Sequence, residues 1–95
     1  MVVTFEWDLS KAATNIRKHG IAFEEAATIF RDALATTFPD PDHSVIERRE
    51  ITIGYTIKRR LAFVSHCERD RRIRIISARV ATPAERRQYE EGIES

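Results

Sequence analysis

Three apolar segments in the second half of the chain alternate with polar residues, and only brief polar stretches connect them. We predict strands over about Arg49–Ile57, Arg60–Cys67 and Arg72–Arg79, because apolar residues with a period of two are typical of half-buried strands. The connections near Lys58-Arg59 and Glu68–Arg71 are short enough for hairpins. The sequence therefore predicts an antiparallel meander, which any fold of this chain has to accommodate.

Helix signals precede the meander. Asp8 or Ser10 can cap a helix over about Lys11–His19, and Gly20 supplies the left-handed residue that ends such a helix. A second helix is predicted over about 23–30, where the apolar residues at positions 23, 26, 27 and 30 form one helical stripe. The first third of the chain is therefore expected to be mainly helical.

Three further elements complete the prediction. Val2–Trp7 and Leu34–Phe38 are predicted as short strands, and the PDPD run that follows the second one as a polar turn. Thr82-Pro83-Ala84-Glu85 is a capping box with proline at the first helical position, and it opens a helix to about Glu91. The order predicts an α+β fold for one domain over residues 1–95: a mostly antiparallel twisted sheet, two N-terminal helices packed on one sheet face, and a C-terminal helix.

Alternation along the strands assigns side chains to the two sheet faces. The face expected to pack under the first two helices carries Ile51, Ile53, Tyr55, Ile57, Leu61 and Phe63. The opposite face, expected to be the working face, carries Arg60, Ala62, Val64 and His66. On the last strand, exposing Arg72 and Arg74 costs less than burying them, since an unpaired buried guanidinium is costly. Ile73 and Ile75 then face the helices, and Arg79 at the strand end can turn either way. A slip of one residue reverses the assignment.

Composition limits the class of protein. With 42% apolar and 33% charged residues among 95, the chain is expected to be a soluble globular domain. No apolar run approaches the roughly 18 residues of a membrane span, and no signal peptide precedes the first strand, so we expect no membrane association and a cytoplasmic location. Cys67 is the single cysteine, which excludes an internal disulfide and predicts a buried structural thiol.

The net charge of +1 hides an asymmetry between the two halves. Residues 47–95 carry twelve basic and eight acidic side chains, whereas residues 1–46 carry four and seven. All but three of the sixteen basic residues are arginines, whose forked guanidinium suits phosphate or carboxylate recognition. The pattern favours a polyanionic partner, either nucleic acid or an acidic protein segment, and the alternative is a solvated arginine-rich β-surface.

Two long segments resemble one protein family. FEWDLSKAATNIRKHGIAFEEAATIF resembles the N-terminal signature of BrnT-type toxins, with its WD-x-x-K element, N-x-x-KHG element and FEEA helix. RIRIISARVATPAERRQYE is similar to the C-terminal signature of the same family. The resemblance implies a RelE-like ribonuclease of a type II toxin–antitoxin pair that inhibits translation. It also implies neutralisation by a ribbon-helix-helix antitoxin in a toxin–antitoxin heterotetramer, with DNA contacted only through the antitoxin.

Metal-independent RNA cleavage needs a base for the 2′-hydroxyl, cations for the charge on phosphorus, and an acid for the leaving 5′-oxygen. The candidate catalytic residues are Arg74, Arg79, His66 and Tyr89. The candidate RNA-binding residues are Arg60, Arg72, Lys18 and His19. His66 is the acid–base candidate because an unperturbed imidazole titrates near pH ~6.5 and can act in both directions. The role of Tyr89 rests on the resemblance alone.

Each candidate also has a structural interpretation. The arginines can be surface residues, and His66 can be a strand residue hydrogen-bonded to its neighbours. His19 at a helix C-terminus can cap carbonyls and gain from the helix dipole. Glu85, one helical turn before Tyr89, is expected to pair with Arg79 or Arg86.

No cofactor and no metal are expected, because the three histidines stand isolated at positions 19, 43 and 66 and no paired-cysteine spacing occurs. His43 is expected to be solvated in the PDPDH turn. The alternative function is that of a non-catalytic binding module, or of a degenerate toxin, whose basic sheet face binds an acidic protein segment or nucleic acid. An enzyme would lose activity on a single substitution, whereas a binder would lose affinity in graded, salt-dependent steps.

Overall fold

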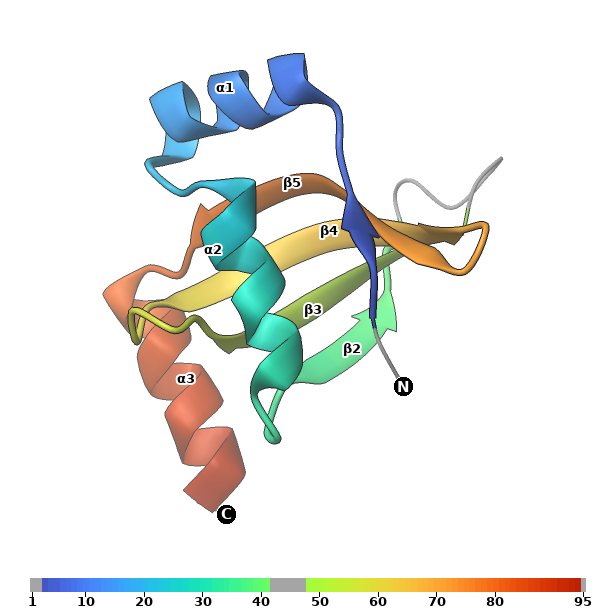
Figure 1. Cartoon of the computed structure of the whole chain (residues 1–95). Helices are drawn as coiled ribbons and strands as arrows, with labels where there is room; N and C mark the ends of the chain where they lie inside the picture. The colour runs from blue at the N-terminus through green and yellow to red at the C-terminus, as the bar shows by residue number, and fades with distance from the viewer. Residues whose placement is uncertain (1–2, 42–47, 95) are drawn as a thin grey trace.

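The computed structural model describes residues 3–41 and 48–94 and shows a five-stranded sheet flanked by helices (Figure 1). The elements in chain order are β1 (Phe5–Glu6), α1 (Leu9–His19), α2 (Phe23–Ala27), the 3₁₀ turn η1 (Thr28–Arg31), β2 (Thr36–Pro39), β3 (Arg49–Tyr55), β4 (Leu61–Arg69), β5 (Arg72–Val80) and α3 (Pro83–Glu94). The strand order is β1-β5-β4-β3-β2, with β1 parallel to β5 and the other pairs antiparallel. The predicted α+β class and the antiparallel meander are confirmed. His43 lies outside the described residues.

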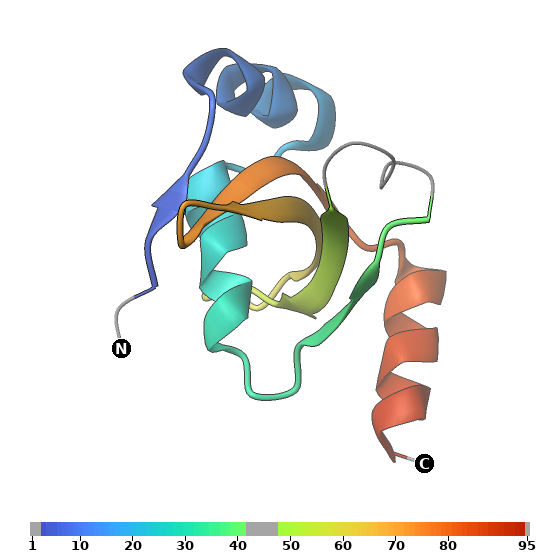
Figure 2. The same ribbon diagram turned by 90° about the vertical axis from the view of Figure 1, so that its right-hand side faces the viewer.

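The helices lie at different sides of the sheet. Figure 2 shows α2 against one sheet face and α3 on the opposite side, and Figure 1 shows α1 beside β5. We call the surface toward α2, which carries Ala62, Val64 and Ile75, the α2 face. We call the opposite surface, which carries Ile53 and Phe63, the α3 face. The ring of Tyr89 on α3 meets the ring of Tyr55 at 6.2 Å between centroids, which fixes α3 on that side.

Local capping follows the sequence closely. The Asp8 side chain accepts a hydrogen bond from the Lys11 backbone N–H at 2.9 Å, so Asp8 is the cap of α1. Gly20 ends this helix with φ of +67°, a conformation that costs glycine little. Thr82 Oγ1 accepts from the Glu85 N–H at 3.1 Å, and Glu85 Oε1 accepts from the Thr82 N–H at 2.9 Å. The predicted capping box is therefore confirmed.

The β4–β5 hairpin turns through two residues. Asp70 and Arg71 both have positive φ, +52° and +65°, as a two-residue turn matching the right-handed strand twist requires. In the β3–β4 connection Arg59 also has positive φ, +64°. Both predicted hairpins are confirmed, although neither turn contains glycine.

The predicted assignment of sheet faces is wrong for β3 and β4. Ala62 and Val64 are fully buried in the core beneath α2 instead of exposed. Gly54 of β3 shares their face, since a Cβ added there would lie 3.3 Å from the Ile29 Cβ. Consequently the side chains expected under the helices, such as Ile51, Ile53 and Phe63, lie on the α3 face, where they are half-buried.

The physical reason is that both sheet faces are apolar, so that alternation alone cannot decide which one meets the helices. Close approach of η1 needs small side chains beneath it, and Gly54 and its strand partner Ala62 meet that need. The larger isoleucines of β3 would hold the helices further from the sheet.

One extra residue in β5 changes the alternation of that strand. Ser77 pairs with Ser65 of β4, but Ile75 pairs with the next residue, His66, so Ile76 has no opposite partner. This arrangement is a β-bulge, in which two residues of one strand oppose one residue of its neighbour.

The bulge brings both arginines of β5 that were proposed as catalytic to the same face. Arg74 and Arg79 are five positions apart and would point to opposite faces of a regular strand. Across the bulge both pair with β4 residues of the α3 face. For the same reason Ile75 and Ala78, three positions apart, are both buried on the α2 face. The predicted burial of Ile75 is confirmed.

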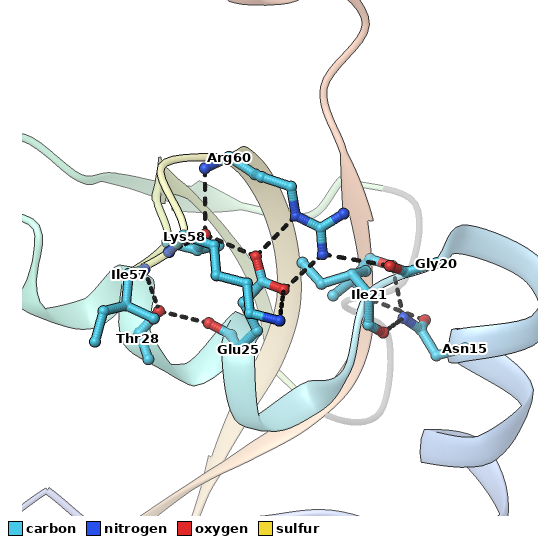
Figure 3. A network of polar contacts seen from close by, with 10 residues as sticks. Asn15, Gly20, Ile21, Glu25, Thr28, Ile57, Lys58 and Arg60 are labelled. Carbon is cyan, nitrogen blue, oxygen red and sulfur yellow. Dashed lines mark hydrogen bonds and ion pairs between the residues drawn. The ribbon is translucent and has the colours of Figure 1, made fainter.

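A buried carboxylate on α2, that of Glu25, fastens the β3–β4 turn to the helices (Figure 3). Arg60 donates to its two oxygens, from Nε at 2.9 Å and from Nη2 at 2.5 Å. Thr56 Oγ1 donates to Oε2 at 2.7 Å, and Arg60 Nη2 also donates to the Gly20 carbonyl at 3.3 Å. The hydrogen bonds from Arg60 lower the pKa of Glu25, against the opposing effect of burial. The network holds the turn, α2 and the end of α1 together.

We expect Arg60→Ala to lower the free energy of unfolding by about 2–4 kcal/mol near neutral pH, because Glu25 would stay buried without its countercharge. The folded-state pKa of Glu25 is lowered, so its contribution is present above the ordinary value of 4.5 and is lost as the pH falls through the folded pKa. The difference between wild type and variant should therefore shrink on acidification in urea denaturation. Arg87→Ala, an exposed arginine on α3, is the control. A difference that stays constant with pH would contradict this account.

Candidate functional site

A cleft of about 320 Å³ opens on the α3 face over β3, β4 and β5. The residues of its lining that bear on chemistry are His19, Asp40, Arg49, Phe63, Ser77 and Arg79. Two of the predicted site residues, His19 from the end of α1 and Arg79 from the end of β5, therefore line one cleft although sixty positions separate them in the chain.

Two further hollows continue this cleft. One, of about 240 Å³, lies beside α1 and shares His19 and Ser77 with the cleft, while Lys18 extends its lining. The other, of about 300 Å³, lies against α3 and shares Phe63 with the cleft, while Tyr89 extends its lining. Together they form a track from α1 to α3 across the α3 face, a shape that suits an extended polymer.

Arg79 is held on two sides. Its guanidinium carbon lies 4.3 Å from the centroid of the Phe63 ring, a cation–π contact. Nη1 and Nη2 donate to the two carboxylate oxygens of Glu85, each at 2.8 Å, which confirms one of the two pairings expected for Glu85. The hydrogen bonds from Arg79 and from the Thr82 N–H lower the pKa of Glu85 to about 2, and the same pair raises the pKa of Arg79. The guanidinium is thus charged and fixed in orientation.

The position of His19 depends on the end of α1. The Gly20 N–H donates to the Ile16 carbonyl at 2.9 Å, so His19 is in the last turn of the helix together with Lys18. Both side chains are exposed, and positive charge in this turn interacts favourably with the helix dipole. One turn earlier, Asn15 is buried and bonds to the backbone of β5.

Tyr89 contributes mainly to the attachment of α3. Its phenol donates a hydrogen bond to the Leu34 carbonyl at 2.8 Å, and its ring meets Tyr55 edge-on. Burial raises the pKa of the phenol. Tyr89 lines the hollow next to Glu85 and so borders the cleft, but its hydroxyl is engaged with the backbone before β2.

His66 lies on the α2 face, and the expectation that it shares an exposed working face with the arginines is wrong. It is 5% exposed, its Nε2 is 2.7 Å from Thr52 Oγ1, and the Phe30 ring lies edge-on at 5.0 Å. Burial lowers the pKa of its imidazole. The reason for the error is the reversed face of β4, which turns even-numbered residues of that strand beneath the helices.

The other predicted arginines do not line the cleft. Arg60 is bound to Glu25 at the helix side of the molecule. Arg74 donates to Glu6 Oε2 of β1 at 2.7 Å, and the more exposed Arg72 lies 3.8 Å from the same carboxylate. Because β4 and β5 run the length of the sheet, the basic residues at positions 58–60 and 69–74 belong to opposite ends of the hairpin, and not to one continuous patch.

Sequence reasoning missed Arg49, Asp40 and Phe63. Phe63 was assigned to the core, and Arg49 was only the first residue of a strand. Asp40 is buried, and its backbone N–H donates to the Arg49 carbonyl at 3.0 Å, which continues the β2–β3 ladder into the cleft. The signal that could have found these residues is the pairing register of β2 with β3, which sequence alone does not supply.

Within residues 3–41 and 48–94, no cluster of three or more His, Cys, Asp or Glu side chains is arranged to hold a metal ion. None of the helices in that part of the chain combines the length and the apolar character needed to cross a bilayer.

Comparison with known proteins gives one consistent result. A family model described as "Ribonuclease toxin, BrnT, of type II toxin-antitoxin system" matches residues 7–85. The chain is similar to the Brucella abortus ribonuclease toxin BrnT, known from a crystal structure at 1.1 Å resolution, with a TM-score of 0.67 and 25% sequence identity. The similarity covers 85% of this chain and 99% of the Brucella protein. Curated protein sequences give no match.

We expect Arg79→Ala to raise the pKa of Glu85 from about 2 toward its ordinary value of 4.5, because the largest cause of the lowering is the hydrogen bonding from Arg79. The side-chain carboxyl ¹³C resonance of Glu85, followed by NMR through an acid titration, measures this change. Arg86→Ala is the matched control, since Arg86 is 4.0 Å from Glu90 on the same helix and pairs with that residue. An unchanged Glu85 titration in Arg79→Ala would show that the two hydrogen bonds from Arg79 to Glu85 do not persist in solution.

Proposed function

The chain belongs to the BrnT family of ribonuclease toxins of type II toxin–antitoxin systems, and on that premise we propose that it is a metal-independent endoribonuclease whose site is the cleft on the α3 face. The observation that carries the proposal is that one cleft contains a fixed guanidinium, Arg79, and an exposed imidazole, His19. We also propose that residues 1–95 form a single RelE-like domain.

The proposed reaction is a transesterification within the RNA. The 2′-hydroxyl attacks the adjacent phosphorus, a P–O2′ bond forms and the P–O5′ bond breaks, so that the products carry a 2′,3′-cyclic phosphate and a free 5′-hydroxyl. One proton leaves the 2′-oxygen and one is delivered to the 5′-oxygen. An imidazole can accept a proton when neutral and donate one when charged, so it can serve either transfer. In this proposal His19 takes that role in place of His66, because His66 is buried on the opposite face.

Arg79 is proposed to stabilise the negative charge on the phosphorane oxygens. A guanidinium has five N–H donors, and Glu85 accepts from two nitrogens at its end, so Nε–H and the outer Nη hydrogens remain suited to a phosphate. Because Phe63 and Glu85 already fix the side chain, little rotamer entropy is lost when RNA binds. Lys18 is proposed to bind a neighbouring phosphate beside α1, and Tyr89 to form the wall at the α3 end.

The toxin–antitoxin family implies an antitoxin partner and an RNA substrate. We propose that the antitoxin is of the ribbon-helix-helix type, that it covers the α3-face cleft in a heterotetramer, and that only the antitoxin contacts DNA. We further propose that free toxin acts in the cytoplasm, where cleavage of RNA inhibits translation. The support for a covering partner is that the track on the α3 face lies open between α1 and α3.

The test is cleavage of bulk cellular RNA by the purified chain in EDTA. We expect cleavage by the wild type and a loss of about 10²-fold or more in Arg79→Ala and in His19→Ala, the magnitude typical of a lost charge-stabilising or acid–base group. Arg87→Ala, an exposed arginine of α3 that does not line the cleft, should retain full activity. A requirement for added metal, or equal cleavage by wild type and Arg79→Ala, would overturn the proposal. Graded loss of RNA affinity without any cleavage would favour the binding-module alternative.

A second prediction separates His66 from His19. We expect His66→Ala to lose about 1–3 kcal/mol of stability, because Thr52 and the ring of Phe30 lose their buried partner. At a temperature where this variant is fully folded by circular dichroism, its cleavage rate should match that of the wild type. A loss of cleavage in folded His66→Ala equal to that in His19→Ala would return His66 to the site.

A further inference from the structure

Asn15 is a buried polar residue of α1 whose side chain bonds entirely to backbone. It is 5% exposed, and its Nδ2 donates to the Ala78 carbonyl at 2.9 Å and to the Ile21 carbonyl at 3.0 Å. Its Oδ1 accepts from the Ala78 N–H at 3.1 Å. Both hydrogens of the amide nitrogen and one lone pair of the oxygen are therefore satisfied. Figure 3 includes the bond between Asn15 and Ile21.

The amide of Asn15 occupies the place of a neighbouring strand along β5. The N–H and the C=O of one strand residue point to the same edge, so the two bonds to Ala78 lie at the edge of β5 away from β4. The strand β1 pairs with β5 only at Ile73 and Arg74, and leaves this part of the edge to α1. A primary amide, which presents a donor and an acceptor side by side, is well suited to such an edge.

The same amide also holds the chain on both sides of His19. Asn15 and His19 are one turn apart on α1, so they lie on the same side of the helix. After His19 the chain turns at Gly20 and reaches Ile21, which is 1% exposed in the core and whose carbonyl accepts from Asn15. The side chain of Asn15 thus holds both ends of the segment that carries His19. The same side chain bonds to Ala78, the residue before Arg79.

We propose that Asn15 is a positioning residue of the ribonuclease site, which fastens the end of α1 to β5 and so sets His19 across the cleft from Arg79. The inference rests on the proposed function of this cleft, because it assigns Asn15 a role through His19. Asn15 is the residue N of the N-x-x-KHG element, and the geometry gives this spacing a physical meaning. A glutamine side chain would be too long to reach the carbonyls of Ile21 and Ala78 together. An aspartate would place a carboxylate oxygen against these carbonyl oxygens, where Asn15 has its Nδ2.

The test measures kcat and KM with a single-stranded RNA oligonucleotide that the wild type cleaves. The variants are Asn15→Leu, which keeps the size and removes the amide, His19→Ala, and the double variant. Ile29→Ala is the matched control for lost stability, since Ile29 is fully buried on the α2 face, away from the cleft. All rates are measured where circular dichroism shows each protein folded. Asn15→Asp is the second variant if Asn15→Leu does not fold.

We expect Asn15→Leu to lower kcat about 10²-fold with little change in KM, as misplacement of a catalytic group does, and Ile29→Ala to retain the wild-type kcat. In the His19→Ala background, Asn15→Leu should cause a much smaller further loss, because the group that it positions is already absent. Equal losses in both backgrounds, or a wild-type kcat in folded Asn15→Leu, would overturn the inference while leaving the proposed function intact. Full activity of His19→Ala would overturn both.

Discussion

The bulge at Ile76 is the constraint on which the arrangement of the site depends. After the bulge, the alternation of side chains between the two faces of β5 is shifted by one residue. Ala78 therefore lies in the core, and Arg79 points to the α3 face. In a regular strand the guanidinium would point to the α2 face, away from Glu85 and the cleft. Two residues beyond the bulge, Asn15 bonds to both backbone groups of Ala78 at the outer edge of β5, so these groups are paired although β1 pairs only with Ile73 and Arg74.

Arg60 and Arg79 form the same kind of ion pair, but the two pairs have different roles. Each guanidinium forks to a glutamate, Arg60 to Glu25 and Arg79 to Glu85. Glu25 has a side chain only 5% exposed, so its pair with Arg60 lies among helix and turn and joins them. Glu85 is 33% exposed and Arg79 43% exposed, and their pair borders a cleft. A pair of the first kind stabilises the fold, whereas one of the second kind orients a cation that solvent, or a phosphate, can still reach.

Much of the local structure was predictable because short-range chemistry determines it. Asp8, Gly20 and the box of Thr82 with Glu85 each act within a few residues, and each was found where the sequence indicated. The faces of β3 and β4 were not predictable in this way. Both faces are apolar, and the choice between them depended on how closely Ile29 of η1 approaches Gly54, a contact between segments far apart in the chain. The wrong prediction that His66 lies on the exposed face followed directly from the reversed choice of faces.

The family resemblance, the succession of elements, their caps and hairpins, and the arginines and histidine near the last strands could all be identified from the residues alone. The packing of the whole chain places His19, and not His66, in a cleft with Arg79, and it leaves Arg60 and Arg74 held elsewhere by Glu25 and Glu6. The physical reason is that caps and turns depend on neighbours in sequence. A site depends on strand register, on one extra residue in a strand, and on which side of a sheet the helices pack, and these are settled by packing of the whole chain.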